Sequence, residues 1–275
     1  MRLALIALLL LGACAAPKPA AESLAKSRLG EAETRAAALA RSGDYAGAAR
    51  HYAEALRLAT ALENADAIAA NAINLSVVQQ WLGRDGEARA ALGAVLDDSR
   101  TPFSERRKTQ AELRRAILDL STGNPGAAAV WAAQADRRCA GTCEYAATIL
   151  NVRAQVELES GQPAQAAQLA QSALERSRGA GGRAEAANAL RTLGRARLAQ
   201  GNASSALESL KQALELDREL GDPRKILADL NELSRAAAAN GDASAAREYR
   251  ERALAVSRAM NDGRSGAEME ALLRR

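Results

Sequence analysis

The chain has 275 residues, of which 48% are hydrophobic and 25% are charged, and its formal net charge is +4. This length allows a sizeable folded body, and the composition is too polar for a multi-span membrane protein. The mild positive charge lacks the dense basic stripe of nucleic-acid-binding proteins, so no nucleic-acid partner is expected. Aromatic residues make up only 3%, and an alanine-rich apolar fraction suits closely packed helices better than a sheet.

Residues 1–13 have the pattern of an export signal. Met1-Arg2 is a short positive start, and Leu3 to Leu11 is an unbroken apolar run of nine residues. That length fits a signal peptide and is too short to span a bilayer. The run leads into Leu11-Gly12-Ala13-Cys14, which resembles the bacterial lipobox. The alternative is an ordinary secretory signal beside an incidental cysteine.

The lipobox resemblance implies that Cys14 becomes the first residue and carries a diacylglyceryl group and an N-acyl chain. Two or more chains anchor a protein stably in a membrane. Ala15 stands where an Asp typically retains a Gram-negative lipoprotein at the inner membrane, so it favours the outer membrane. Residues 14–21 are predicted to form a short extended tether of roughly 20 Å. We therefore expect the folded domain, residues 22–275, to lie close to the membrane and to face the periplasm.

One pattern then recurs about every 40 residues. Glycines lie at successive spacings of 40, 40, 38, 40 and 40 residues, an alanine follows each glycine by five positions, and a small residue precedes it by seven. The glycines are Gly43, Gly83, Gly123, Gly161, Gly201 and Gly241; the alanines are Ala48, Ala88, Ala128, Ala166, Ala206 and Ala246; the small residues are Ala36, Ser76, Ala116, Ala154, Gly194 and Ser234. Small side chains allow two helices to cross closely, so the pattern predicts helix pairs that stack into a solenoid.

Residues around each glycine predict how the helices end and begin. The glycine supplies the left-handed residue that ends a first helix. Asp44, Asn124, Asn202 and Asp242 are predicted N-caps of second helices, and Pro125 and Pro163 suit the first helical position. The third repeat departs from the pattern, because Glu112, Arg115 and Asp119 fall at expected core positions. Its apolar residues Leu113, Ile117 and Leu120 would fit better if the register slipped by one.

The segment from Gly43-Asp44-Tyr45 to Ala55-Leu56, and the run from Leu190 through Gly194 to Gly201-Asn202, resemble the tetratricopeptide-repeat (TPR) family. The resemblance covers about residues 28–261. It implies an all-α, TPR-like α-solenoid, a right-handed superhelix of antiparallel helix pairs. The repeats are expected at about 28–62, 64–98, 104–138, 143–178, 183–220 and 223–261, with a capping helix at 265–275. The period of about 40, against 34 for the family's basic unit, suggests longer helices.

Once Cys14 is assigned to lipid, two cysteines remain, Cys139 and Cys143. In an oxidising periplasm such a close pair is expected to form a disulfide. The alternatives are a redox pair or a metal site. A metal would need two more ligands, and the only histidine, His51, is distant in sequence.

The TPR resemblance implies a partner-binding groove lined by the first helices of the repeats, at positions ten and six before each turn glycine. These positions are apolar in the middle of the N-terminal half and rich in amides and arginines in the C-terminal half. The predicted groove residues at these positions are Asn151, Gln155, Arg191, Arg195, Asn231 and Arg235. Asn74 and Trp81, on the first helix of the second repeat, are added to them. Arginine and amide groups suit a peptide backbone, a carboxylate or an acidic segment. The alternatives are that these polar groups are solvated surface, that Ile73, Val77, Leu113 and Ile117 are core, and that Trp81 is buried packing.

No enzyme is predicted, because a single histidine leaves no Ser-His-Asp or metal-histidine constellation, and no phosphate-binding loop or G-x-S-x-G is present. No cofactor or metal is expected. The leading hypothesis is a lipid-anchored periplasmic scaffold that binds a protein or peptide partner in an envelope assembly or secretion machine. The alternatives are a regulator of an envelope enzyme, such as a peptidoglycan synthase or hydrolase, and a cryptic enzyme.

Overall fold

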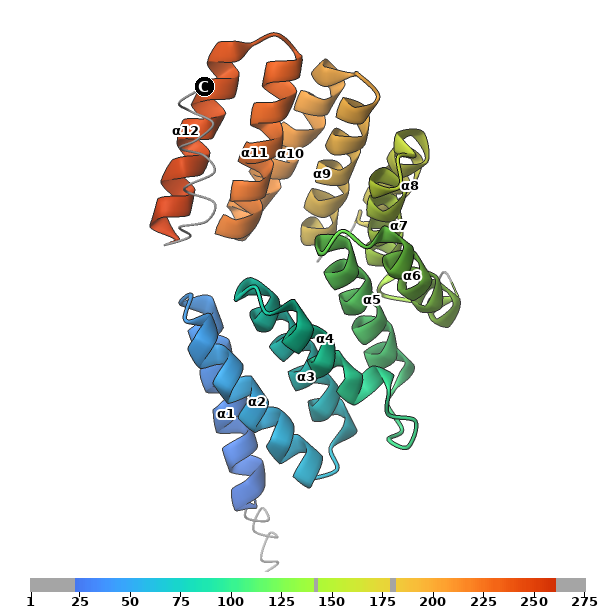
Figure 1. Cartoon of the computed structure of the whole chain (residues 1–275), viewed down its shortest axis with the longest axis vertical. Coiled ribbons are helices and arrows are strands. Elements are labelled where there is room, and N and C mark those ends of the chain that lie inside the picture. Colours follow the sequence, from blue (N-terminus) through green and yellow to red (C-terminus); the bar gives the residue numbers. More distant parts are fainter. Residues whose placement is uncertain (1–22, 141–142, 179–181, 261–275) are drawn as a thin grey trace, which may run out of the picture.

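The computed structural model describes residues 23–140, 143–178 and 182–260. Within these ranges the regular secondary structure is entirely helical, and twelve helices pair into six antiparallel hairpins (Figure 1). The helices are α1 Leu24–Arg41, α2 Tyr45–Ala61, α3 Ala65–Trp81, α4 Asp85–Leu96, α5 Glu105–Ser121, α6 Pro125–Cys139, α7 Ala146–Glu159, α8 Pro163–Arg176, α9 Arg183–Ala199, α10 Ala203–Leu220, α11 Pro223–Ala239 and α12 Ala243–Ala259. The predicted all-α fold is confirmed; the signal peptide, Cys14, the tether and the 265–275 cap lie outside the described residues.

Each hairpin turns at the glycine that the sequence pattern marks. The six turn glycines have φ between +72° and +85°, a conformation that costs glycine little because it has no Cβ. Asp44 caps α2 by accepting a 2.8 Å hydrogen bond from the Gly47 N–H, and Asp242 accepts a 2.9 Å bond from the Ala245 N–H. Asn202 occupies the predicted N-cap position of α10, but its side chain makes no capping hydrogen bond.

Small side chains occupy the helix crossings. The six alanines that follow the turn glycines are 0–1% exposed. The crossing of α9 and α10 leaves no space beside Gly194, because a Cβ there would lie 2.6 Å from Leu210 Cγ and 3.3 Å from the Ala206 carbonyl oxygen. Larger residues at these positions would hold the paired helices apart.

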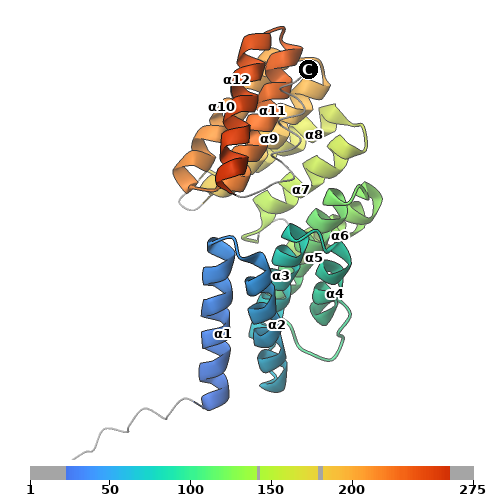
Figure 2. The ribbon, with the colours of Figure 1, turned by 60° about the vertical axis from the view of Figure 1, so that its left-hand side comes forward.

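The hairpins stack in chain order into a curved solenoid. Each helix packs against the next, and the first helices also pack on one another, α3 on α5, α5 on α7, α7 on α9 and α9 on α11. These first-helix contacts place the odd-numbered helices on the inner side of the curve. The curve brings the last hairpins back over the ends of the first ones (Figures 1 and 2). None of the described helices is both long and apolar enough to cross a membrane.

The third hairpin buries charges without a register slip. Glu112 is 3% exposed and Asp119 is 1% exposed. Arg138 of α6 bonds Glu112 at 3.0 Å, and Arg89 of α4 bonds Asp119 at 3.1 Å. Ion pairing with hydrogen bonds offsets part of the cost of removing a carboxylate from water. Both acids therefore keep the repeat register, and Ile117, at 37% exposure, is on the surface.

Replacing Gly194 by Ala tests the close crossing. The added methyl group meets Leu210 and the Ala206 carbonyl, so we expect the free energy of unfolding to fall by about 1–3 kcal/mol. Gly126→Ala is the matched control, because its Cβ would meet no atom within 4 Å, and Ala there should be neutral or stabilising by roughly 0.4–1 kcal/mol. Denaturant unfolding followed by circular dichroism measures both, and equal stability of the two variants would contradict the crossing geometry.

Candidate functional site

Polar side chains one repeat apart contact each other along the inner face. We call these five pairs the polar ladder: Glu33–Asn71, Asp66–Arg107, Arg106–Glu144, Glu159–Arg195 and Arg191–Asp229. Their partners are 36 to 41 residues apart and lie 2.6–2.7 Å from each other. Each repeat therefore presents a donor or acceptor that its neighbour satisfies.

Arg191 is part of this ladder and is not an open groove residue as predicted. Its side chain is 11% exposed. Nε donates to Asp229 Oδ1 of α11 at 2.6 Å, Nη1 donates to Asn188 Oδ1 at 3.0 Å, and the guanidinium pairs with Asp217 of α10. A guanidinium whose donors are used in this way ties three helices together and is not free to bind a partner.

The other predicted residues of the C-terminal half divide by exposure. Asn151 is 3% exposed, so its predicted role in the groove is also wrong. Arg195 is 31% exposed and lies between Glu159 at 2.7 Å and Glu232 at 3.5 Å. Arg235 is 65% exposed and reaches Glu232 at 3.6 Å. Gln155 and Asn231 are half-buried. Of this group, Arg235 is the residue most accessible to a partner.

Buried ionisable groups gather where α9, α10 and α11 meet. Burial raises the pKa of the Asp229 carboxyl to about 7, with a further contribution from Asp217, while Arg191 opposes the change. Burial, followed by the charge of Arg191, lowers the pKa of Lys225. Burial also raises the pKa of Glu185. Among the described residues, no group of three or more histidine, cysteine, aspartate and glutamate side chains is arranged to hold a metal ion.

An open hollow of about 500 Å³ lies between the first helices of the N-terminal hairpins. Glu33 of α1, Asn71 and Asn74 of α3 and Arg107 of α5 are among the side chains that line it. Asn74 is exposed. The hollow is therefore lined by acidic, basic and amide side chains, and Asn74 among them is a predicted groove residue.

Trp81 ends α3 and is 40% exposed. Its ring centroid lies 4.9 Å from that of Tyr45, at the start of α2, with the planes inclined by 60°. The guanidinium of Arg224 lies over both rings, 4.6 Å from the Tyr45 centroid and 4.9 Å from the Trp81 centroid. The sequence singled out Trp81 but gave no sign of Arg224, which lies 179 residues after Tyr45.

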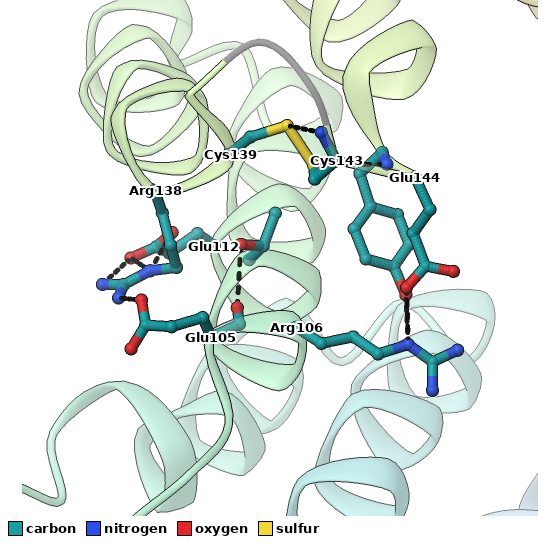
Figure 3. Close-up of a disulfide and its surroundings, with 9 residues drawn as sticks. Glu105, Arg106, Glu112, Arg138, Cys139, Cys143 and Glu144 are labelled. Carbon is teal, nitrogen blue, oxygen red and sulfur yellow. Dashed lines mark hydrogen bonds and ion pairs between the residues drawn. A yellow bond between two sulfur atoms is a disulfide. The ribbon is translucent and has the colours of Figure 1, made fainter.

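Cys139 and Cys143 form a disulfide between the end of α6 and the start of α7, with Cα atoms 5.1 Å apart (Figure 3). Arg138, next to Cys139, bonds Glu112 and Glu105 of α5. Glu144, next to Cys143, accepts a 2.7 Å bond from Arg106 of α5. The disulfide thus joins two segments that both contact α5, which fixes the corner between the third and fourth hairpins.

A helix-pair solenoid with a polar inner face belongs to the α-solenoid repeat proteins. A family profile described as "Tetratricopeptide repeat" matches residues 145–219, which contain all of α7, α8 and α9 and nearly all of α10. Together with the six hairpins, this match shows a tetratricopeptide-repeat-like solenoid in which residues 145–219 match the family's repeat. Repeat proteins of this kind generally act as scaffolds for protein–protein interaction. No curated protein matches the chain.

Solved structures share this fold. BtubC (BKLC) from P. vanneervenii aligns with a TM-score of 0.54 and 21% identity, over 87% of this chain and 93% of that chain. A signal-transduction ATPase with a tetratricopeptide-repeat sensor from Pyrococcus horikoshii aligns with a TM-score of 0.62 and 17% identity, over 90% of this chain and 37% of that chain. A Rap protein complexed with Competence and Sporulation Factor aligns with a TM-score of 0.60 and 17% identity, over 86% of this chain and 67% of that chain. At these identities the likeness shows the fold alone.

The raised pKa of Asp229 predicts that stability falls as the pH rises. The folded-state pKa of about 7 exceeds the ordinary value of 3.8, so the folded chain binds the extra proton and loses this contribution between about pH 4 and pH 7. Asp229→Asn cannot ionise, so we expect its unfolding free energy to depend less on pH in that range. Asp242→Asn, an exposed cap that stays a good N-cap, is the control. Identical pH profiles for wild type and Asp229→Asn would contradict this assignment.

Proposed function

We propose that the chain is a lipid-anchored scaffold that holds a protein or peptide partner against the first helices of its N-terminal hairpins. The main observation in support of this proposal is the open hollow of about 500 Å³ at Asn74. The exposed amide of Asn74 can both donate and accept hydrogen bonds with a partner. Glu33, Asn71 and Arg107 are paired within the polar ladder and form the walls of the hollow. This combination suits an extended peptide segment.

The N-terminal half is favoured over the C-terminal half because it holds the open hollow and because two predicted groove residues are accessible there. Asn74 is exposed and Trp81 is 40% exposed, whereas Arg191 and Asn151 are engaged or buried within the solenoid. The similar Rap protein is complexed with Competence and Sporulation Factor, which supports a binding role for a solenoid of this shape.

The proposed location is the periplasmic side of the outer membrane of a Gram-negative cell, with lipid on Cys14. The supporting observations are the lipobox-like Leu11-Gly12-Ala13-Cys14 and the disulfide, which is typical of an oxidising compartment. The first described helix begins at Leu24, ten residues after Cys14. We propose that the anchored scaffold serves an envelope assembly or secretion machine.

A photo-crosslinking amino acid at Asn74, in cells that carry the full chain, tests the proposal. We expect a crosslinked protein partner from position 74, because that side chain lines the hollow. The matched control places the same crosslinker at Ala90, an exposed position on the second helix α4, and should give no such product.

Membrane fractionation of the Cys14→Ser variant tests the lipid anchor independently of partner binding. The wild-type chain should fractionate with membranes, and the variant should move to the soluble fraction because it cannot carry the lipid. Equal membrane retention of the wild-type chain and Cys14→Ser would contradict the proposed lipid anchor. Equal crosslinking from positions 74 and 90 would contradict partner binding at the hollow.

A further inference from the structure

The two ends of the solenoid meet through three side chains. Arg224, the second residue of α11, donates a 3.1 Å hydrogen bond from Nε to the Tyr45 hydroxyl of α2. The same guanidinium lies over the rings of Tyr45 and Trp81. This bond joins residues 179 apart, whereas the polar ladder joins neighbouring repeats. Figures 1 and 2 show why the contact is possible, since α11 lies over the ends of α2 and α3.

Repeat packing does not call for aromatic side chains at these two positions. The residue two after the turn glycine is Tyr45 in the first repeat and Asp85, Pro125, Pro163, Ala203 and Ala243 in the others. The residue two before the glycine is Trp81 in the second repeat and Arg41, Ser121, Glu159, Ala199 and Ala239 in the others. Two of only seven aromatic residues in the chain therefore lie where hairpins fold without them, and they face each other and Arg224.

The position of Arg224 is not explained by its own helix. A cation in the first turn of a helix is disfavoured by the helix dipole. Pro223 begins α11 and Asp222 accepts hydrogen bonds from the Arg224 and Lys225 N–H groups at 3.1 and 3.2 Å, which fixes the backbone. The stabilising contacts of the guanidinium come from the aromatic pair, because the negative ring faces attract a cation.

We propose that Arg224, Tyr45 and Trp81 form a latch that holds the solenoid in its curled form and that can open. One cation held by two rings and one hydrogen bond shifts a two-state equilibrium by roughly tenfold. A tenfold shift is large enough to favour the closed form, and it is small enough that binding of a partner to the open form can reverse it. The latch joins the ends of the solenoid without adding to its core, so opening leaves each hairpin intact. This inference goes beyond the proposed function and does not depend on it.

Small-angle X-ray scattering of the full chain with Arg224→Ala tests the latch. We expect the ratio of closed to open chains to fall roughly tenfold, seen as a larger radius of gyration with unchanged helical circular dichroism. Arg218→Ala is the control, because Arg218 is 53% exposed and pairs with Glu215 of its own helix at 3.6 Å. Arg224→Lys, which keeps the charge but loses the planar guanidinium, should open partially.

A second readout follows Trp81 itself. In a Trp131→Phe background Trp81 is the sole tryptophan, since the chain has two. Arg224→Ala should then increase quenching of its fluorescence by acrylamide, because one ring face is uncovered. If Arg224→Ala lowers the helical signal, Trp81→Leu replaces it in the scattering measurement and should open the chain in the same way. Unchanged dimensions in both variants, or unchanged quenching with Arg224→Ala, would overturn the latch.

Discussion

The close crossing of paired helices is the constraint on which the rest of the structure depends. At each hairpin an alanine five residues after the turn glycine is almost completely buried, and at the fifth hairpin there is no room even for a methyl group on Gly194. Close pairing gives each repeat the same compact shape, and equal shapes stack at a regular angle. The first helices are then brought into contact along the inner side, where the polar ladder forms.

The polar ladder limits which side chains of the inner face are available to a partner. A charged residue there meets a complementary group one repeat away, as Arg191 meets Asp229 and Asp66 meets Arg107. These contacts satisfy buried polar groups and fix the spacing of the repeats. They also remove arginines from the surface offered to a partner. The accessible inner surface is thereby concentrated at the Asn74 hollow and, in the C-terminal half, at Arg235.

The sequence predicts the fold well because the relevant signals are local or strictly periodic. Turn glycines and crossing alanines mark every hairpin, and Asp44 caps its helix as its position suggests. The site is harder to predict because exposure depends on groups far along the chain. Arg191 could have been recognised as internal from the opposite charge of Asp229, 38 residues later. No periodic signal links Arg224 to Tyr45, since their contact comes from the curvature of the whole solenoid.

Native-state hydrogen exchange of an Ala206→Leu variant tests the crossing constraint most directly. Ala206 is 0% exposed, whereas Ala255 of α12 is exposed, so Ala255→Leu is the matched comparison. We expect Ala206→Leu to lose amide protection in α9 and α10, with smaller losses in the adjacent hairpins, and Ala255→Leu to keep wild-type protection. Wild-type protection of α9 and α10 in Ala206→Leu would contradict the crossing constraint.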